Sequence, residues 1–264
     1  MPRTSTSGAT SSPTPAVDRA FQILEYLATI SPEAGVTEIA NALDINKSTC
    51  YNILQSMART GVVVRDSRFP VYRLGPKLVE LGTASRRNFN HRDDVKQMVR
   101  PLVEKFGITC LIAQPLPGYR GFVVTDRYLP RGEDILSAPI GQVYPVNAPA
   151  MGRAFLAFED IHGSAIAPAD FGLRTNADLD ALLRGADEAR EDGYGRSVGE
   201  QNQGINAVAA PVRGTDGRVN FLLCIFGYTQ HFPDDQIDEV GTALRALADQ
   251  ISYRVQGVAG YSDR

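Results

Sequence analysis

The sequence predicts an α+β protein of two domains, and three observations support this. With 264 residues, 43% of them hydrophobic, the chain exceeds the usual size of one domain and can bury two cores. Short amphipathic helices and one hairpin occupy the first part, whereas long apolar strand segments alternate with helices after about residue 91. Residues 1–90 carry a net charge of +3 and residues 91–264 carry −6. This asymmetry allows the first part to contact nucleic acid.

The two ends of the chain and its cysteines exclude several classes of protein. Residues 1–15 are rich in Ser, Thr, Pro and Gly and predict a disordered tail, and residues 259–264 predict a flexible C-terminus. No apolar run approaches the roughly 20 residues of a membrane span, and no secretory signal is visible, so we expect a cytoplasmic protein without a membrane partner. The three cysteines (Cys50, Cys110 and Cys224) and the three histidines are scattered without metal-ligand spacing. Reduced, buried thiols and no metal or cofactor are therefore expected.

Residues 16–76 predict three helices. Apolar residues recur at three and four positions over residues 17–28, which predicts an amphipathic helix ending near Ser31-Pro32. Thr37 is the predicted N-cap of a short second helix. The apolar positions expected on its inner side are Ile39, Ala42 and Leu43. A third helix is predicted from about Lys47 to just before Gly61. Two short helices joined by three or four residues predict a helix-turn-helix.

A basic hairpin follows the third helix. Residues 62–74 read V-V-V-R-D-S-R-F-P-V-Y-R-L, two β-rich segments around a polar turn. Arg65 and Arg68 lie at the tip, and Arg73 lies on the returning strand. Three helices followed by such a hairpin describe a winged helix-turn-helix. Residues 77–90 then predict a linker helix to the rest of the chain.

The third helix carries a polar face that suits DNA. Its inward positions Ile53, Leu54 and Met57 leave the polar residues on the other side and at the first turn. Hydroxyl groups and a helix N-terminus can bind phosphate, and Asn or Gln can pair with both hydrogen-bonding groups of adenine. An ordinary solvated face is the alternative, and the arginines of the hairpin favour double-stranded DNA. The predicted DNA-binding residues are Thr37, Lys47, Ser48, Thr49, Tyr51, Asn52, Gln55, Arg65, Arg68 and Arg73.

Residues 91–258 predict an α+β domain with an antiparallel sheet. Strands are expected at 109–116 and 121–129, joined by P-G-Y-R, and at 206–213 and 219–228, joined by a turn at T-D-G-R. The expected helices cover residues 93–106, 149–158, 178–192 and 233–255.

The whole chain resembles the IclR family of bacterial transcriptional regulators. In the first domain the resemblance is carried by A-V-D-R-A-F-Q-I-L-E-Y-L, T-E-I-A-N-A-L-D-I-N-K-S-T and Y-R-L-G-P-K-L-V-E-L-G. In the second it is carried by Y-P-V-N-A-P-A-M-G-R-A-F-L-A-F, by residues 191–212 and by T-D-G-R-V. The resemblance implies a winged helix-turn-helix joined by a linker helix to a GAF-like effector-binding domain with an antiparallel sheet. It also implies homodimers or dimers of dimers on palindromic operators, controlled by a small organic acid, and no catalysed reaction.

The resemblance also implies where an effector binds. Carried over position by position, the family's pocket falls on Ala150, Met151, Ser197, Ile205, Ala207, Cys224 and Phe226. Members that bind small hydroxy or keto acids tend to place an acidic residue, a cysteine and serines at several of these positions, whereas this chain is more apolar. We therefore expect an aromatic or otherwise apolar acid. Asn147-Ala148-Pro149 also departs from the family's usual sequence of the His-Ala-Thr/Ser type. Asn52 stands where many members have arginine, so the family's operator preference is not transferred to this chain.

Three alternatives remain open. Arg127 suits a carboxylate because its guanidinium can form two parallel hydrogen bonds, although such an arginine more often pairs with a nearby acid. The second domain could be a small-molecule hydrolase or transferase, but no local signature pairs a cysteine nucleophile with His162 or His231. A constitutive DNA-binding protein without a ligand would have an unbroken core in the second domain.

Overall fold

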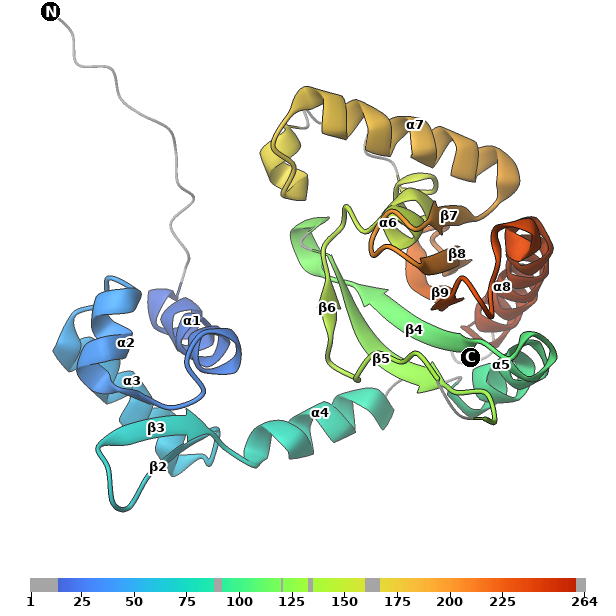
Figure 1. Cartoon of the computed structure of the whole chain (residues 1–264). Coiled ribbons are helices and arrows are strands. Elements are labelled where there is room, and N and C mark those ends of the chain that lie inside the picture. Colours follow the sequence, from blue (N-terminus) through green and yellow to red (C-terminus); the bar gives the residue numbers. More distant parts are fainter. Residues whose placement is uncertain (1–13, 88–91, 120, 133–134, 160–166, 260–264) are drawn as a thin grey trace, which may run out of the picture. The chain divides into compact units, whose positions relative to one another are not determined.

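The computed structural model describes residues 14–87, 92–119, 121–132, 135–159 and 167–259, and the chain forms two compact units, Met1–Asn90 and His91–Arg264 (Figure 1). Most of the tail expected over residues 1–15, and all but one residue of the expected C-terminus 259–264, lie outside the described residues. The predicted α+β class, with an N-terminal winged helix-turn-helix followed by a domain with an antiparallel sheet, is confirmed.

The first unit is a three-helix domain with a small sheet. Its elements are α1 (Pro15–Thr29), β1 (Ala34–Gly35), α2 (Val36–Ala42), α3 (Lys47–Arg59), β2 (Val63–Arg65), β3 (Val71–Leu74) and α4 (Lys77–Arg87). β2 and β3 form the predicted hairpin, and β1 adds a third antiparallel strand on the outer side of β3. Ile23, Ile39, Leu54 and Tyr72 are fully or almost fully buried, so the helices and the hairpin share one core.

Three sequence-based expectations for this unit are wrong. Thr37 does not cap α2, because the helix begins at Val36 with Gly35 in the N-cap position and no side-chain cap. Gly35 also pairs with Val71 of β3, and this long-range strand contact sets where the helix starts. The predicted apolar stripe of α1 is only partly buried, because Val17 and Phe21 are exposed. Likewise Ala42 is exposed on α2, where the inner positions are Ile39 and Ala40.

The second unit contains a six-stranded antiparallel sheet in the order β6-β5-β4-β9-β8-β7. Its elements are α5 (Arg92–Phe106), β4 (Thr109–Pro115), η1 (Pro117–Tyr119), β5 (Phe122–Tyr128), β6 (Val143–Tyr144), α6 (Pro149–Leu156), η2 (Pro168–Phe171), α7 (Asn176–Asp192), β7 (Gly195–Val198), β8 (Ile205–Arg213), β9 (Val219–Tyr228), η3 (Asp234–Gln236) and α8 (Ile237–Ala259). β6 and β7 are short edge strands that the pattern of residue types did not predict as strands.

Helices cover both faces of this sheet. α6 packs on β7, β8 and β9, and α7 packs on α6, whereas α5 and α8 pack together on the opposite side (Figure 1). Side chains alternate between these two cores, so the central strands β4, β8 and β9 are apolar along almost their whole length. Within the described residues no helix combines the length and hydropathy needed to cross a membrane, and no three potential metal ligands come together.

Candidate functional sites

α3 presents most of the predicted polar residues to solvent. Asn46 caps the helix, and its Oδ1 atom accepts hydrogen bonds from the Ser48 amide at 2.9 Å and the Ser48 hydroxyl at 2.7 Å. Cys50, Leu54 and Met57 are buried, while Ile53, expected on the inner side, is only half-buried. The exposed or half-buried residues on the remaining surface are Lys47, Ser48, Thr49, Tyr51, Asn52 and Gln55.

Gln55 connects α3 to the wing. Its Nε2 atom donates a hydrogen bond of 2.8 Å to the hydroxyl of Tyr72, which is buried on β3. The amide therefore has a structural partner, and its carbonyl oxygen and second amide hydrogen remain for other contacts. This bond fixes the wing against the helix, a role for Gln55 that the sequence did not reveal because the two residues lie 17 positions apart.

The arginines of the wing differ in their surroundings. Arg65 and Arg68 are exposed at the tip. Arg73 lies 3.7 Å from the carboxylate of Glu33, and both side chains are more than half exposed. An exposed ion pair of this kind is weak, so Arg73 can exchange Glu33 for a phosphate at little cost. Thr37, although not an N-cap, is exposed in the first turn of α2.

The second unit contains a pocket that gathers seven of the eight effector-binding residues predicted from the sequence. Ser197, Ala207 and Phe226 are opposite one another on β7, β8 and β9, so their side chains share one face of the sheet. The residues lining this cavity of about 160 Å³ are Leu111, Leu136, Ser137, Tyr144, Ala148, Pro149, Ala150, Met151, Ser197, Gln201, Asn202, Ile205, Ala207, Cys224 and Phe226. The sheet register and the start of α6 thus bring the predicted residues to one place.

Arg127 does not line this pocket but supports its wall. Its Nη1 atom donates to the Ser137 hydroxyl at 2.8 Å and to the Ala138 carbonyl at 3.1 Å. Because Arg127 is opposite Leu111 on the neighbouring strand, its side chain leaves the sheet on the pocket face. Arg127 therefore contacts the segment that carries Ser137.

Ser197 and the start of α6 place hydrogen-bond donors at the pocket. The Ser197 side chain is 2% exposed, and its hydroxyl has no hydrogen-bond partner among the described residues. Pro149 occupies the first turn of α6 and lacks an N–H, so Ala150 and Met151 carry the first free backbone donors of that helix. A ligand oxygen would satisfy these groups, because the first N–H groups of a helix and its dipole favour negative charge.

Cys224 is a poor nucleophile. Burial raises the pKa of its thiol to about 12, and burial also raises the pKa of Cys110 and Cys50. Reactive cysteines require the opposite shift, and no Lys, Arg or His lines the pocket as described. The arrangement therefore provides a binding site and gives no support to thiol chemistry.

An ion pair near the pocket was not predicted from the sequence. Arg153 of α6 donates from Nη1 and Nη2 to both carboxylate oxygens of Glu200, at 2.7 and 2.6 Å, and from Nη1 to the Arg196 carbonyl at 2.7 Å. This two-bond contact holds the segment that carries Gln201 and Asn202 against the pocket helix. Since Arg153 and Glu200 are 47 positions apart, no local pattern relates them.

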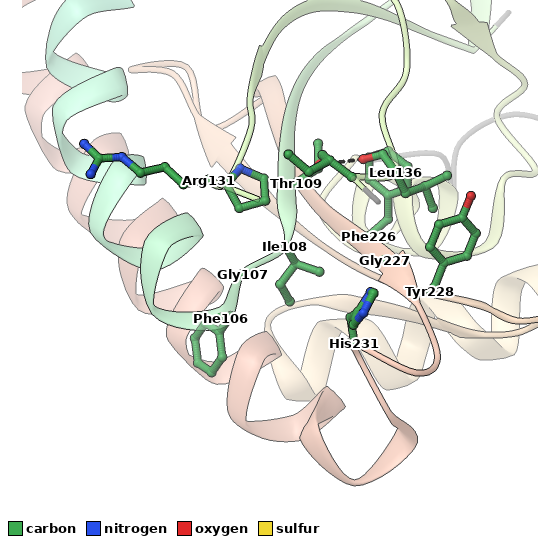
Figure 2. A pocket seen from close by; sticks show the side chains of 12 residues that line it. Phe106, Gly107, Ile108, Thr109, Arg131, Leu136, Phe226, Gly227, Tyr228 and His231 are labelled. Atoms are coloured by element: carbon green, nitrogen blue, oxygen red, sulfur yellow. Dashed lines mark hydrogen bonds between the residues drawn. The ribbon is translucent and has the colours of Figure 1, made fainter. Parts of the chain in front are cut away.

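A second cavity of about 230 Å³ shares Leu136 and Phe226 with the first. Figure 2 shows His231 and Ile108 at this cavity, the hydrogen bond from the Thr109 hydroxyl to the Leu136 carbonyl, and the Arg131 guanidinium directed away from the other labelled residues. No predicted site residue except Phe226 lies there.

Comparison with known proteins identifies the chain. Residues 16–67 match the IclR helix-turn-helix domain, and residues 89–253 match the C-terminal domain of the bacterial transcriptional regulator IclR. The chain belongs to the IclR family. It is therefore a DNA-binding transcriptional regulator, and the predicted resemblance is confirmed. The matched families and the relatives are regulators and not enzymes.

Relatives of this IclR-family chain match it over most of its length. It is 28% identical over 249 residues to the HTH-type transcriptional regulator XynR of Escherichia coli, covering 88% of this chain and 96% of XynR. It is 26% identical over 249 residues to the HTH-type transcriptional repressor AllR of Salmonella typhimurium, covering 90% and 88% of the two chains. Among solved structures, an IclR transcriptional regulator from Alicyclobacillus acidocaldarius is 27% identical with a TM-score of 0.74, covering 92% and 99%.

Proposed function

We propose that this regulator binds a small aromatic or otherwise apolar organic acid in the pocket between α6 and strands β7–β9, and that the acid changes its affinity for a palindromic operator. The supporting observation is the convergence of seven residues around a largely apolar cavity with one unpartnered buried hydroxyl, Ser197. The carboxylate would bind the Ser197 hydroxyl and the N–H groups of Ala150 and Met151. The ring would pack on Leu111 and Phe226.

Arg127 would support the pocket without contacting the acid. Its bonds to Ser137 and Ala138 hold the segment that closes the pocket, so it would orient Ser137 and not clamp the acid directly. The protein would act in the cytoplasm as a homodimer or a dimer of dimers, because a palindromic operator requires two recognition helices related by symmetry. The acid would act by binding one arrangement of the oligomer more tightly than another.

Calorimetry with a panel of acids tests the effector class. We expect benzoate-type acids to bind at least about tenfold more tightly than pyruvate or glyoxylate, a difference of about 1.4 kcal/mol. The preferred acid should also change the anisotropy-measured affinity for a duplex that the protein itself selects from a random pool. Tighter binding of pyruvate or glyoxylate would contradict the proposed class. No thermal shift with any acid would favour a regulator without a ligand.

Two substitutions separate base recognition from backbone contact at the DNA surface. Asn52→Ala should reduce the preference for the selected duplex over a scrambled one by about 1–3 kcal/mol, because Asn52 is exposed on α3 and can pair with adenine. Arg68→Glu should weaken binding to both duplexes alike, because a phosphate contact carries no sequence information. Fluorescence anisotropy at fixed salt measures both affinities. Equal effects of the two substitutions on scrambled DNA would remove this assignment of roles.

A further inference from the structure

The tip of the wing exposes an aromatic side chain beside two arginines. Phe69 is 65% exposed, and Pro70, Arg65 and Arg68 are exposed with it. In contrast Tyr72, three residues further along, is 2% exposed in the core of the same unit. The hairpin therefore distributes its aromatic residues unequally, with one holding the wing to α3 and one directed to solvent.

The tip holds Phe69 in a fixed backbone conformation. The Oδ1 atom of Asp66 accepts hydrogen bonds from the backbone N–H groups of Arg68 and Phe69, at 2.8 and 3.0 Å. The N–H of Asp66 donates to the Val71 carbonyl at 2.9 Å, and the N–H of Val71 donates to the Phe69 carbonyl at 2.8 Å, which closes a tight turn around Pro70. A side chain carried on such a turn loses little further backbone entropy when it binds.

The surroundings of Phe69 specify one kind of partner. A phenylalanine that is 65% exposed contributes little to the fold, and Arg65 before the turn and Arg68 next to Phe69 make the tip attractive to phosphate. The backbone hydrogen bonds from Arg68 and Phe69 lower the pKa of Asp66. The Asp66 carboxylate is therefore stabilised by the N–H groups of the turn. Apolar side chains that enter the minor groove of DNA between two base pairs, with basic residues beside them, have this composition.

We propose that Phe69, supported by Pro70, is a wedge that enters the minor groove of operator DNA and kinks it, while Arg65 and Arg68 bind the flanking phosphates. The proposal rests on the DNA-binding role of this domain and adds a deformation step to it. Because α3 and the wing are fixed to each other by the Gln55–Tyr72 hydrogen bond, insertion of the wedge and reading of the major groove occur in one fixed geometry. Base steps that unstack easily, such as TA and CA, would then be preferred beneath the wing, at positions that α3 does not contact.

The bend of the DNA tests this inference. The full-length protein is bound at saturating concentration to a duplex it has selected from a random pool, and the distance between dyes at the two ends is measured by energy transfer. We expect the wild-type complex to be kinked by at least about 20° and Phe69→Ala to lose most of that kink. Phe69→Leu should retain it, since leucine also acts as a wedge. The matched control is Ser67→Ala, an exposed substitution on the same turn that should leave the bend unchanged.

A second readout separates the wedge from electrostatic contact. Arg68→Ala should lower the affinity for DNA and reduce the slope of log affinity against log salt concentration by about one, because one phosphate contact is lost. The bend should be preserved. A Phe69→Ala complex as bent as the wild type, or a wild-type complex with straight DNA, would overturn the proposal and leave the DNA-binding role intact. Failure of the wild-type protein to select any sequence would instead contradict both that role and the wedge.

Discussion

Replacement of Ala207 with phenylalanine is expected to abolish effector binding while DNA binding persists. Ala207 lies in the middle of the pocket wall, opposite Ser197 on β7 and Phe226 on β9. A phenyl ring at this position would occupy much of a cavity of about 160 Å³. We expect affinity for the preferred acid to fall at least about 100-fold, or about 2.7 kcal/mol, when measured by calorimetry.

The control for this prediction is an alanine to phenylalanine change elsewhere in the same unit. Ala181 is exposed on α7 and does not line the pocket, so Ala181→Phe should leave the affinity for the acid unchanged. Anisotropy without ligand should show that both variants bind the selected duplex as the wild type does. Unchanged acid binding by Ala207→Phe would mean that the effector lies elsewhere, and the second cavity beyond Phe226 would become the next candidate.

The sequence predicted the main elements of this protein because their signals are local. The third helix begins at Lys47 as expected, and the continuous apolar runs mark β4, β8 and β9, which are buried on both faces. Positions of the pocket came from family resemblance and not from residue pattern. Ala207 and Phe226 carry no chemical signal alone, and only the register of the sheet places them side by side.

The features that sequence did not predict depend on contacts between distant residues. Gly35 replaces Thr37 at the start of α2 because Gly35 also pairs with Val71. Val17 and Phe21 fit a helical period as well as Ile23 does, and only packing against the other helices distinguishes the buried residue. Local patterns identify candidate faces of a helix, and tertiary contacts decide which of them is buried.

The contact between Arg153 and Glu200 at the pocket is a further feature that local sequence patterns do not predict. Each is an ordinary charged residue in the sequence, and their two-bond contact exists because α6 and the segment after β7 meet in the folded unit. The contact ties together two walls of the pocket, one carrying Met151 and the other Asn202. The geometry of the ligand site therefore depends on how closely α6 approaches β7.

A single methyl group at Gly195 tests that dependence. The Cβ atom of alanine at this position would overlap the carbonyl oxygen of Ala150 and would lie 2.7 Å from the amide nitrogen of Ala154, both backbone atoms of α6. Backbone atoms cannot rotate away as a flexible side chain can, so β7 and α6 must move apart. We expect Gly195→Ala to lower the free energy of unfolding by about 3 kcal/mol and the melting temperature by about 6–12 °C. Differential scanning calorimetry measures the transition.

The same substitution at Gly82 provides the control, because the structure places nothing within 4 Å of the added carbon there. Gly82 lies inside α4, where alanine is the better helix former by about 1 kcal/mol, so Gly82→Ala should be neutral or stabilising. Ser197 and Ala150 lie on the two elements that Gly195→Ala forces apart, so acid affinity should fall together with stability. An unchanged melting temperature for Gly195→Ala would show that α6 and β7 are not in close contact, and the pocket derived from that contact would be wrong.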